Sequence, residues 1–302
     1  MDTTEVVPEV RERLVVRFGP DVLGWCDRLP TLVDRLSERW GLQVREAGGG
    51  GTSRVFRCTR HQDGSVVRLK LTPDPVIAAE EAEALEAWAG TRSVVTLLAE
   101  DLDSGALLLD EVLPGAPVRR PGRSLPQVAA LLRELRMPAP APRQGSVLGP
   151  LARRVEFLFE LTRRRMVHAG SADAYRALDR SVIERSREAA LELAAGGTAG
   201  LVHGDFHPGN VLTGPGGRLV AIDPRPALGD PDFDAVDWVL AGAGEMAGLT
   251  AGIDRLAKLV PGQSPDRVLA WCRALAVVEA VPRLRTGRDD PTTRLLLSLS
   301  RS

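Results

Sequence analysis

Apolar residues recur at helical spacing within the first forty residues. Positions three to four apart, the spacing of one buried helix face, are apolar at Leu32, Val33, Leu36 and Trp40. Pro30-Thr31 precedes this set and Gly41 follows it, as is typical of helix starts and ends. The pattern predicts that this segment is helical, with a helix beginning near Thr31 and ending at Gly41.

Strand-like alternation replaces the helical period farther along the chain. Residues 55–59 and 65–71 alternate between apolar and polar side chains, and Gln62-Asp63-Gly64 lies between them as a turn. This arrangement predicts an antiparallel hairpin. A glycine run, 48–51, precedes the hairpin.

The pattern then predicts one helix and two further strands. The helix covers about 75–89, and the strands are the apolar runs 94–98 and 106–110. Leu113-Pro114-Gly115 interrupts the pattern. We therefore expect one lobe at 1–113 and a second lobe at 114–302.

The second lobe is predicted to be mainly helical. Residues 125–200 follow the helical period, apart from a Pro-rich loop at 137–143, and 265–282 form a strongly apolar helix that contains Trp271. A sheet followed by helices favours an α+β fold of two lobes with a cleft between them.

Composition narrows the class of protein. Hydrophobic content of 44%, charged content of 26% and a net charge of −1 describe a soluble globular chain. Such a balance gives no reason to expect nucleic acid or an anionic membrane as partner. Three scattered cysteines, no signal-like N-terminus and no long apolar run predict a cytoplasmic protein.

Polar residues with phosphoryl-transfer chemistry follow two apolar stretches. Asp205 lies in a short turn after Leu201-Val202, Asn210 comes five residues later, and Asp223 ends the stretch Arg218–Ile222. An acid in such a turn can orient an acceptor hydroxyl, while the amide and the second acid supply oxygen ligands to magnesium. The layout predicts transfer from a metal-bound nucleoside triphosphate.

Two other chemistries could use residues of the same segment. His203 and His207 are four residues apart, as in zinc proteases, but Gly204, Pro208 and Gly209 disfavour the helix that such a site needs. A serine hydrolase would need a Gly-x-Ser-x-Gly elbow, which the sequence lacks.

Lys70 and the glycine run form a second constellation. The run allows close backbone approach to phosphates, although an ordinary flexible turn would look the same. It is not a P-loop, because Thr52-Ser53-Arg54 follows the glycines. Lys70 lies between Leu69 and Leu71 on a predicted strand. It can serve as a phosphate ligand or as a surface lysine at a strand edge.

Taken together, these residues resemble the kinase-like antibiotic phosphotransferases, and within them the streptomycin 6-kinase (aminoglycoside/hydroxyurea kinase) family. The resemblance runs in order through Trp40, the glycine run, Lys70, the His203–Asn210 segment and Asp223. It implies a two-lobed protein-kinase-like fold. The smaller N-terminal lobe would be an antiparallel sheet with a helical extension, and the larger C-terminal lobe mainly helical.

The resemblance also implies a role for individual residues. Lys70 would contact the nucleotide phosphates and pair with Glu81, with Glu80 and Glu83 as alternatives. Asp205 would be the catalytic base, and Asn210 and Asp223 would hold magnesium. The remaining nucleotide contacts would come from the glycine loop and the hinge, namely Gly49, Gly50, Gly51, Thr52, Ser53, Glu111 and Leu113.

Four further residues are assigned beside this site. His203 would brace the catalytic loop, and Asp234 would hold the loop backbone or cap the helix that follows it. Asp230 is a candidate substrate contact or a surface turn acid. Glu279 shares the face of Trp271 and is expected to face the substrate, the alternative being the helix surface.

The implied activity is ATP- and Mg²⁺-dependent phosphorylation of a hydroxyl group on a small cationic acceptor, an aminoglycoside of the streptomycin type. A kinase for an amino-sugar, hydroxyurea or another alcohol would keep the same catalytic residues. A pseudokinase would lack one of Lys70, Asp205, Asn210 and Asp223, and all four are present. One departure from the family is Leu135-Arg136, where Leu-His is frequent.

Overall fold

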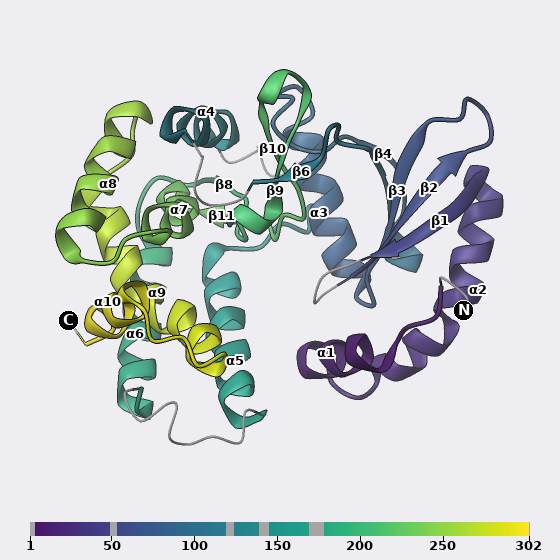
Figure 1. Ribbon diagram of the computed structural model, residues 1–302. Helices are drawn as coiled ribbons and strands as arrows, with labels where there is room; N and C mark the ends of the chain where they lie inside the picture. The colour runs from purple at the N-terminus through teal and green to yellow at the C-terminus, as the bar shows by residue number, and fades with distance from the viewer. Residues whose placement is uncertain (1–3, 49–52, 119–123, 139–144, 169–177, 302) are drawn as a thin grey trace. The chain divides into compact units, whose positions relative to one another are not determined.

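The computed structural model describes residues 4–48, 53–118, 124–138, 145–168 and 178–301. The chain divides into two compact units, residues 1–115 and 116–302 (Figure 1). Within the described ranges, no helix is long and apolar enough to cross a membrane.

The first unit is built on a five-stranded sheet in which every neighbouring pair is antiparallel. The strand order is β1-β2-β3-β5-β4. The strands are β1 Leu42–Gly48, β2 Arg54–Arg60, β3 Val66–Leu71, β4 Leu97–Asp101 and β5 Ala106–Asp110. The β2–β3 hairpin pairs Val55 with Lys70 and Phe56 with Leu69, which places Lys70 and Phe56 on opposite faces.

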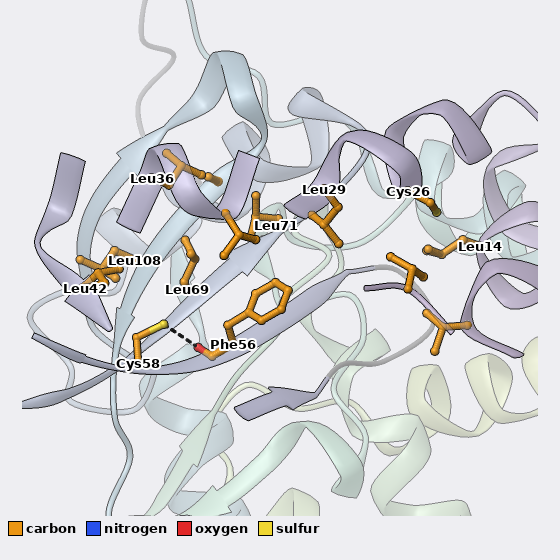
Figure 2. Packing of buried hydrophobic residues seen from close by; sticks show 14 of the residues in the cluster. Leu14, Cys26, Leu29, Leu36, Leu42, Phe56, Cys58, Leu69, Leu71 and Leu108 are labelled. Carbon is orange, nitrogen blue, oxygen red and sulfur yellow. Dashed lines mark hydrogen bonds between the residues drawn. The ribbon is translucent and has the colours of Figure 1, made fainter. Parts of the chain in front are cut away.

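Two N-terminal helices, α1 Pro8–Phe18 and α2 Val22–Trp40, cover the face that carries Phe56. Figure 2 shows Leu14, Leu29 and Leu36 of these helices around Phe56, Leu69 and Leu71 of the sheet. Each of these side chains is fully buried. Gly41 ends α2 in the left-handed conformation that favours glycine.

Helix α3, Pro75–Ala87, packs against β4 and β5. Its start is well defined, because Asp74 accepts a hydrogen bond from the Val76 amide at 3.0 Å and Pro75 occupies the first helical position. This helix carries Glu81, which is 1% exposed.

The second unit contains longer helices and two small three-stranded sheets. The helices α5, α6 and α10 all contact α9, which is buried along most of its length. The helices are α4 Leu125–Leu135, α5 Leu151–His168, α6 Arg180–Ala195, α7 Val236–Leu240, α8 Met246–Leu259, α9 Pro265–Arg285 and α10 Pro291–Leu299.

The two small sheets of this unit have the orders β10-β9-β6 and β11-β8-β7. Their strands are β6 Ala116–Pro117, β7 Met137–Pro138, β8 Gly200–Val202, β9 Val211–Thr213, β10 Leu219–Ala221 and β11 Ala227–Gly229. Short 3-10 turns connect several of them. The two turns used below are η3 Pro208–Asn210 and η5 Pro231–Ala235.

The main elements agree with the sequence prediction, with two corrections. The predicted start of a helix near Thr31 is wrong, since α2 begins at Val22 and passes through Pro30. The apolar stripe of α2 extends upstream to Cys26 and Leu29, and its burial outweighs the backbone hydrogen bond that proline cannot make.

The second correction concerns the run 94–98. The β4 ladder begins only at Leu97, opposite Leu109, and continues to Asp101. Val94 and Val95 are nevertheless buried. Their apolar character therefore reflects side-chain packing and does not mark a regular strand. The overall class, an antiparallel sheet followed by a mainly helical region, is as predicted.

Candidate active site

The segment that follows β8 is folded into a tight loop by its own backbone. The Arg225 amide donates to the His203 carbonyl at 2.8 Å, and the Ile222 amide donates to the Asn210 carbonyl at 2.9 Å. Gly204 has a φ of +74°, and a Cβ atom there would lie 2.0 Å from the Arg225 carbonyl oxygen. Only glycine fits this position.

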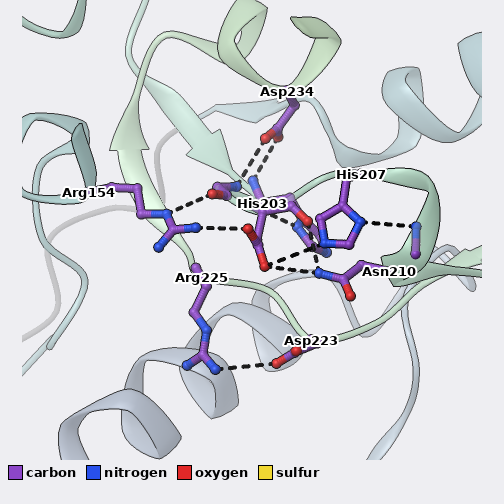
Figure 3. A network of polar contacts seen from close by, with 10 residues as sticks. Arg154, His203, His207, Asn210, Asp223, Arg225 and Asp234 are labelled. Atoms are coloured by element: carbon purple, nitrogen blue, oxygen red, sulfur yellow. Dashed lines mark hydrogen bonds and ion pairs between the residues drawn. The ribbon is translucent and has the colours of Figure 1, made fainter. Parts of the chain in front are cut away.

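Asp205 is held on both carboxylate oxygens. Arg154 of α5 donates from Nη2 to Oδ1 at 2.8 Å, and Asn210 donates from Nδ2 to Oδ2 at 3.1 Å (Figure 3). Arg154 also donates from Nε to the Gly204 carbonyl at 2.8 Å. The Asp205 side chain keeps 32% exposure. It is therefore oriented, yet accessible to a small molecule.

His203 and Asp234 anchor the loop from beneath. Asp234 accepts the His203 amide at 2.7 Å and the Gly204 amide at 3.0 Å. The His203 ring is fully buried, packs beside Phe206 and accepts the Asp205 amide on Nδ1 at 3.4 Å. Burial lowers the pKa of His203 to about 4 and raises the pKa of Asp234 to about 7.

The proposed capping role of Asp234 is wrong. Asp234 lies inside the turn η5, and α7 begins after Ala235 without a side-chain cap. Its carboxylate points to the loop amides, which is the other role considered for it (Figure 3).

Asn210 and Asp223 offer a pair of oxygen donors. Asn210 Nδ2 donates to Asp205, which turns the amide oxygen away from that carboxylate. Asp223 has a φ of +55° and lies just after Ile222, whose amide is bonded to the Asn210 carbonyl. Mg²⁺ typically takes one or two protein oxygens besides phosphates and water. This pair fits that requirement.

A zinc site at the two histidines does not fit. His203 Nδ1 and His207 Nδ1 each accept a backbone amide, at 3.4 Å from Asp205 and 3.0 Å from Gly209. Over the described ranges, no group of three or more His, Cys, Asp or Glu side chains could hold a metal ion. His207 instead points Nε2 towards Asp205 Oδ2, 3.9 Å away.

Glu279 of α9 lies in the electrostatic field of this loop. Burial raises its pKa, the Asp205 charge adds to the shift, and His207 and Arg165 oppose it. The side chain is mostly buried, so the interpretation as a plain helix-surface residue is wrong. Glu279 is thus coupled electrostatically to Asp205 and His207.

Asp230 does not have the setting of a substrate contact. It is 3% exposed, and its Oδ2 accepts hydrogen bonds from Arg267 Nε and Trp271 Nε1, both at 2.8 Å. Its Oδ1 accepts the Asp232 amide at 3.0 Å. Neither the substrate contact nor the surface acid considered for it matches this burial. Asp230 joins the turn η5 to α9.

Arg136 stands where the family often has histidine, and it pairs with Asp232 of η5. Asp232 is buried and also accepts the Ser264 amide at 3.1 Å. The departure from the family pattern therefore forms an internal ion pair.

Lys70 and Glu81 form a buried ion pair in the first unit. Lys70 Nζ lies 2.5 Å from Glu81 Oε2, and the two side chains are 5% and 1% exposed. Lys70 is therefore no surface lysine. Of the three acids considered on α3, the structure pairs Glu81 with it.

The other predicted nucleotide contacts are placed as follows. Gly49, Gly50, Gly51 and Thr52 lie outside the described residues, whereas Ser53 is buried. The Glu111 carboxylate pairs with Arg68 at 2.8 Å, and its amide donates to Asp110 Oδ1 at 2.9 Å. Leu113 is 61% exposed.

Sequence reasoning missed two arginines, Arg154 and Arg225. Arg154 contacts Asp205, and Arg225 Nη2 lies 3.5 Å from Asp223 Oδ1 (Figure 3). In a chain whose basic residues are almost all arginine, residue type alone carries no signal. The proximity of Arg225 to Asp223 in sequence was the one clue available.

Comparison with known proteins identifies the family of this chain. Residues 39–287 match the model of a family described as aminoglycoside/hydroxyurea antibiotic resistance kinase. A hydroxyurea phosphotransferase of Kitasatospora aureofaciens is 33% identical over 87% of this chain and 75% of its own length. A streptomycin 6-kinase of Streptomyces glaucescens is 32% identical over 78% of this chain and 75% of its own length.

Solved structures share the fold at low sequence identity. A choline kinase of Streptococcus pneumoniae aligns with a TM-score of 0.62 at 13% identity, covering 90% of this chain and 98% of its own. An aminoglycoside phosphotransferase crystallised with ADP and hygromycin B aligns with a TM-score of 0.56 at 16% identity, covering 89% and 97%. The fold is therefore kinase-like.

Proposed function

The chain belongs to the aminoglycoside/hydroxyurea antibiotic resistance kinase family, and from this premise we propose that it phosphorylates a hydroxyl group of a streptomycin-type aminoglycoside. The donor in this proposal is ATP with Mg²⁺. The observation that carries it is Asp205, an accessible carboxylate fixed by Arg154 and Asn210.

The chemical step follows from the two Asp205 oxygens. An acceptor hydroxyl donates its proton to Asp205 Oδ2 as its oxygen bonds to the γ-phosphorus. The bond from that phosphorus to the β,γ-bridging oxygen breaks, and its electron pair leaves with ADP. Asp205 accordingly orients the hydroxyl and takes up its proton.

The phosphate groups need cationic partners. Lys70, held by Glu81 in the first unit, would contact the α- and β-phosphates, and Ser53 would follow the glycine loop over them. Asn210 and Asp223 would hold magnesium, which neutralises charge on the β- and γ-phosphates when bound. The backbone of Glu111 to Leu113 would contact the base.

A cationic acceptor is supported by Glu279. This mostly buried acid shares the field of Asp205, and an ammonium or guanidinium group of the acceptor would offset the cost of keeping both acids ionised together. The proposed location is the cytoplasm. ATP and Mg²⁺ are supplied there, and the three buried free cysteines would stay reduced.

Hydroxyurea is the second candidate acceptor, because a relative of 33% identity is a hydroxyurea phosphotransferase. It carries a hydroxyl group but no positive charge. An acceptor of this kind would use Asp205 in the same way and draw nothing from Glu279.

A transfer assay with both acceptor types tests the proposal. ADP release and phosphorus NMR of the product are measured with streptomycin, other aminoglycosides, hydroxyurea and amino-sugars. We expect Asp205→Asn to lower turnover by about 100- to 10,000-fold, because a general base typically accelerates a reaction by that factor. The nucleotide Kd should be unchanged. Asp254→Asn, an exposed acid on α8, is the matched control and should keep full turnover.

The Glu279→Gln variant separates the acceptors in the same assay. It should raise the KM for streptomycin while leaving the KM for hydroxyurea unchanged. Full turnover by Asp205→Asn would contradict the assignment of Asp205. Turnover on hydroxyurea alone would replace the cationic acceptor by the neutral one.

A further inference from the structure

Arg154 makes two hydrogen bonds to consecutive residues of the catalytic loop. Its Nε donates to the Gly204 carbonyl and its Nη2 to Asp205 Oδ1, both at 2.8 Å. Its side chain is 10% exposed and projects from the first turn of α5. The planar guanidinium therefore fixes the loop backbone and the carboxylate relative to each other.

This contact makes the two Asp205 oxygens unequal. Oδ1 receives a charge-assisted hydrogen bond from a buried cation, whereas Oδ2 receives the neutral Asn210 amide at 3.1 Å and faces His207 Nε2 at 3.9 Å. An acceptor hydroxyl competes more easily for the oxygen that has the weaker bonds. Oδ2 is thus the oxygen left for the acceptor.

Nearby acidic side chains stabilise the buried positive charge of Arg154. Burial lowers the pKa of this guanidinium, and the charges of Asp205, Asp223 and Asp237 oppose that shift. A cation in this place stabilises several acids that would otherwise repel one another.

We propose that Arg154 is a positioning residue, which holds Oδ1 of Asp205 so that Oδ2 meets the acceptor hydroxyl. The inference rests on the proposed phosphotransfer. It assigns a function to a side chain that touches neither acceptor nor nucleotide in that proposal.

Kinetics of Arg154→Gln and Arg154→Lys test this role. We expect Arg154→Gln to lower kcat by about 10- to 100-fold through loss of one charge-assisted hydrogen bond and of the orientation it fixes. The KM for ATP should stay within about twofold of the wild type. Arg154→Lys keeps the charge but not the fork, and it should recover part of the loss.

The neighbouring Arg153 supplies the matched control. It is exposed on the same helix and donates to the Val147 carbonyl at 3.4 Å. Arg153→Gln should keep kcat. Thermal midpoints of all the variants show whether a loss of activity reflects unfolding.

A second readout does not depend on the acceptor. Carbon NMR of aspartate-labelled protein follows the Asp205 carboxyl resonance, assigned by its disappearance in Asp205→Asn. It should shift in folded Arg154→Gln and remain in place in Arg153→Gln. An unshifted resonance, or a kcat within about twofold of the wild type, would overturn the inference. If the wild type phosphorylates no acceptor, the proposed function fails, and the NMR result still decides whether Arg154 holds the Asp205 carboxylate.

Discussion

Several side chains at the catalytic loop hold the loop backbone in place and take no part in the chemical step. The Asp234 carboxylate accepts hydrogen bonds from the amides of His203 and Gly204. The buried His203 ring accepts a hydrogen bond from the Asp205 amide. Because the chain's own side chains make these contacts, they preorganise the loop that carries Asp205. Such preorganisation is what phosphoryl transfer requires of a protein.

The buried histidine predicts a specific pH dependence of stability. Its pKa falls from the ordinary 6.5 to about 4 on folding, because burial disfavours the charged ring. In the unfolded chain, His203 therefore becomes protonated as the pH falls below 6.5. In the folded protein, it becomes protonated only near pH 4. The stability due to His203 is complete above that window and is lost as the pH falls through it.

His203→Gln, which cannot take up this proton, should lose less stability over the same window. The difference between the two free energies of unfolding should change by up to about 3 kcal/mol. Chemical denaturation at a series of pH values measures it. Parallel curves for wild type and variant would show that His203 is not held neutral. Asp234, whose pKa is raised, acts in the opposite direction in both proteins, so it cancels in the difference.

Residue identities in the loop were readable from sequence because the chemistry demands particular groups at fixed spacing. The Lys70–Glu81 pair needed one helix to follow one strand, and three neighbouring acids were candidates until the structure paired one of them. Arg154 was not readable, since its contact with Asp205 spans 51 positions along the chain. No local pattern records a contact of that range.

At the scale of elements, helices were easier to predict than their ends. The packing stripe of α2 overrides the helix start suggested by Pro30-Thr31, and the apolar run at Val94 is buried without being a regular strand. In both cases tertiary packing outweighs a local signal. The catalytic loop was predictable because its glycines and prolines leave few backbone alternatives.

The sharp turn between β8 and η3 gives a prediction for one glycine. Gly204→Ala must overcome both a positive φ and a Cβ 2.0 Å from the Arg225 carbonyl. We expect a loss of about 3 kcal/mol or more, because strain and overpacking add. Asp205 should shift with the loop, so turnover should fall as well.

Gly216→Ala is the matched control for that variant. Gly216 also has a positive φ, +65°, but a Cβ there meets nothing within 4 Å. Its cost should be about 1 kcal/mol from the backbone alone. Thermal and chemical unfolding of both variants give the comparison. Equal losses would mean that the close approach to Arg225 relaxes without cost.

For the whole molecule, the N-terminal helices matter more than the family match suggests. The match begins at residue 39, yet α1 and most of α2 lie before it and supply the apolar cover of the sheet in the first unit. Phe56, Leu69 and Leu71 are fully buried by that cover. The sheet that carries Lys70 therefore depends on residues outside the matched range.

Removal of residues 1–38 should accordingly unfold the first unit and abolish nucleotide binding. Two single substitutions in α2 test the same dependence with a smaller change. Leu29→Ala, at a fully buried position, should cost about 2–5 kcal/mol. Leu23→Ala, at a position 39% exposed, should cost under about 1 kcal/mol. Denaturation followed by tryptophan fluorescence measures both. A shortened chain that still binds ATP with unchanged affinity would contradict this dependence.

The position of this cover at the start of the chain also matters on the ribosome. Helices α1 and α2 are synthesised before β2, β3 and β5, the strands that carry their packing partners. Because synthesis proceeds at roughly 5–20 residues per second, their apolar stripe stays uncovered for several seconds until the sheet emerges. During that interval the nascent chain offers a hydrophobic helix face to whatever is near. Chaperone engagement should therefore concentrate on this early stretch and end once β5 has left the exit tunnel.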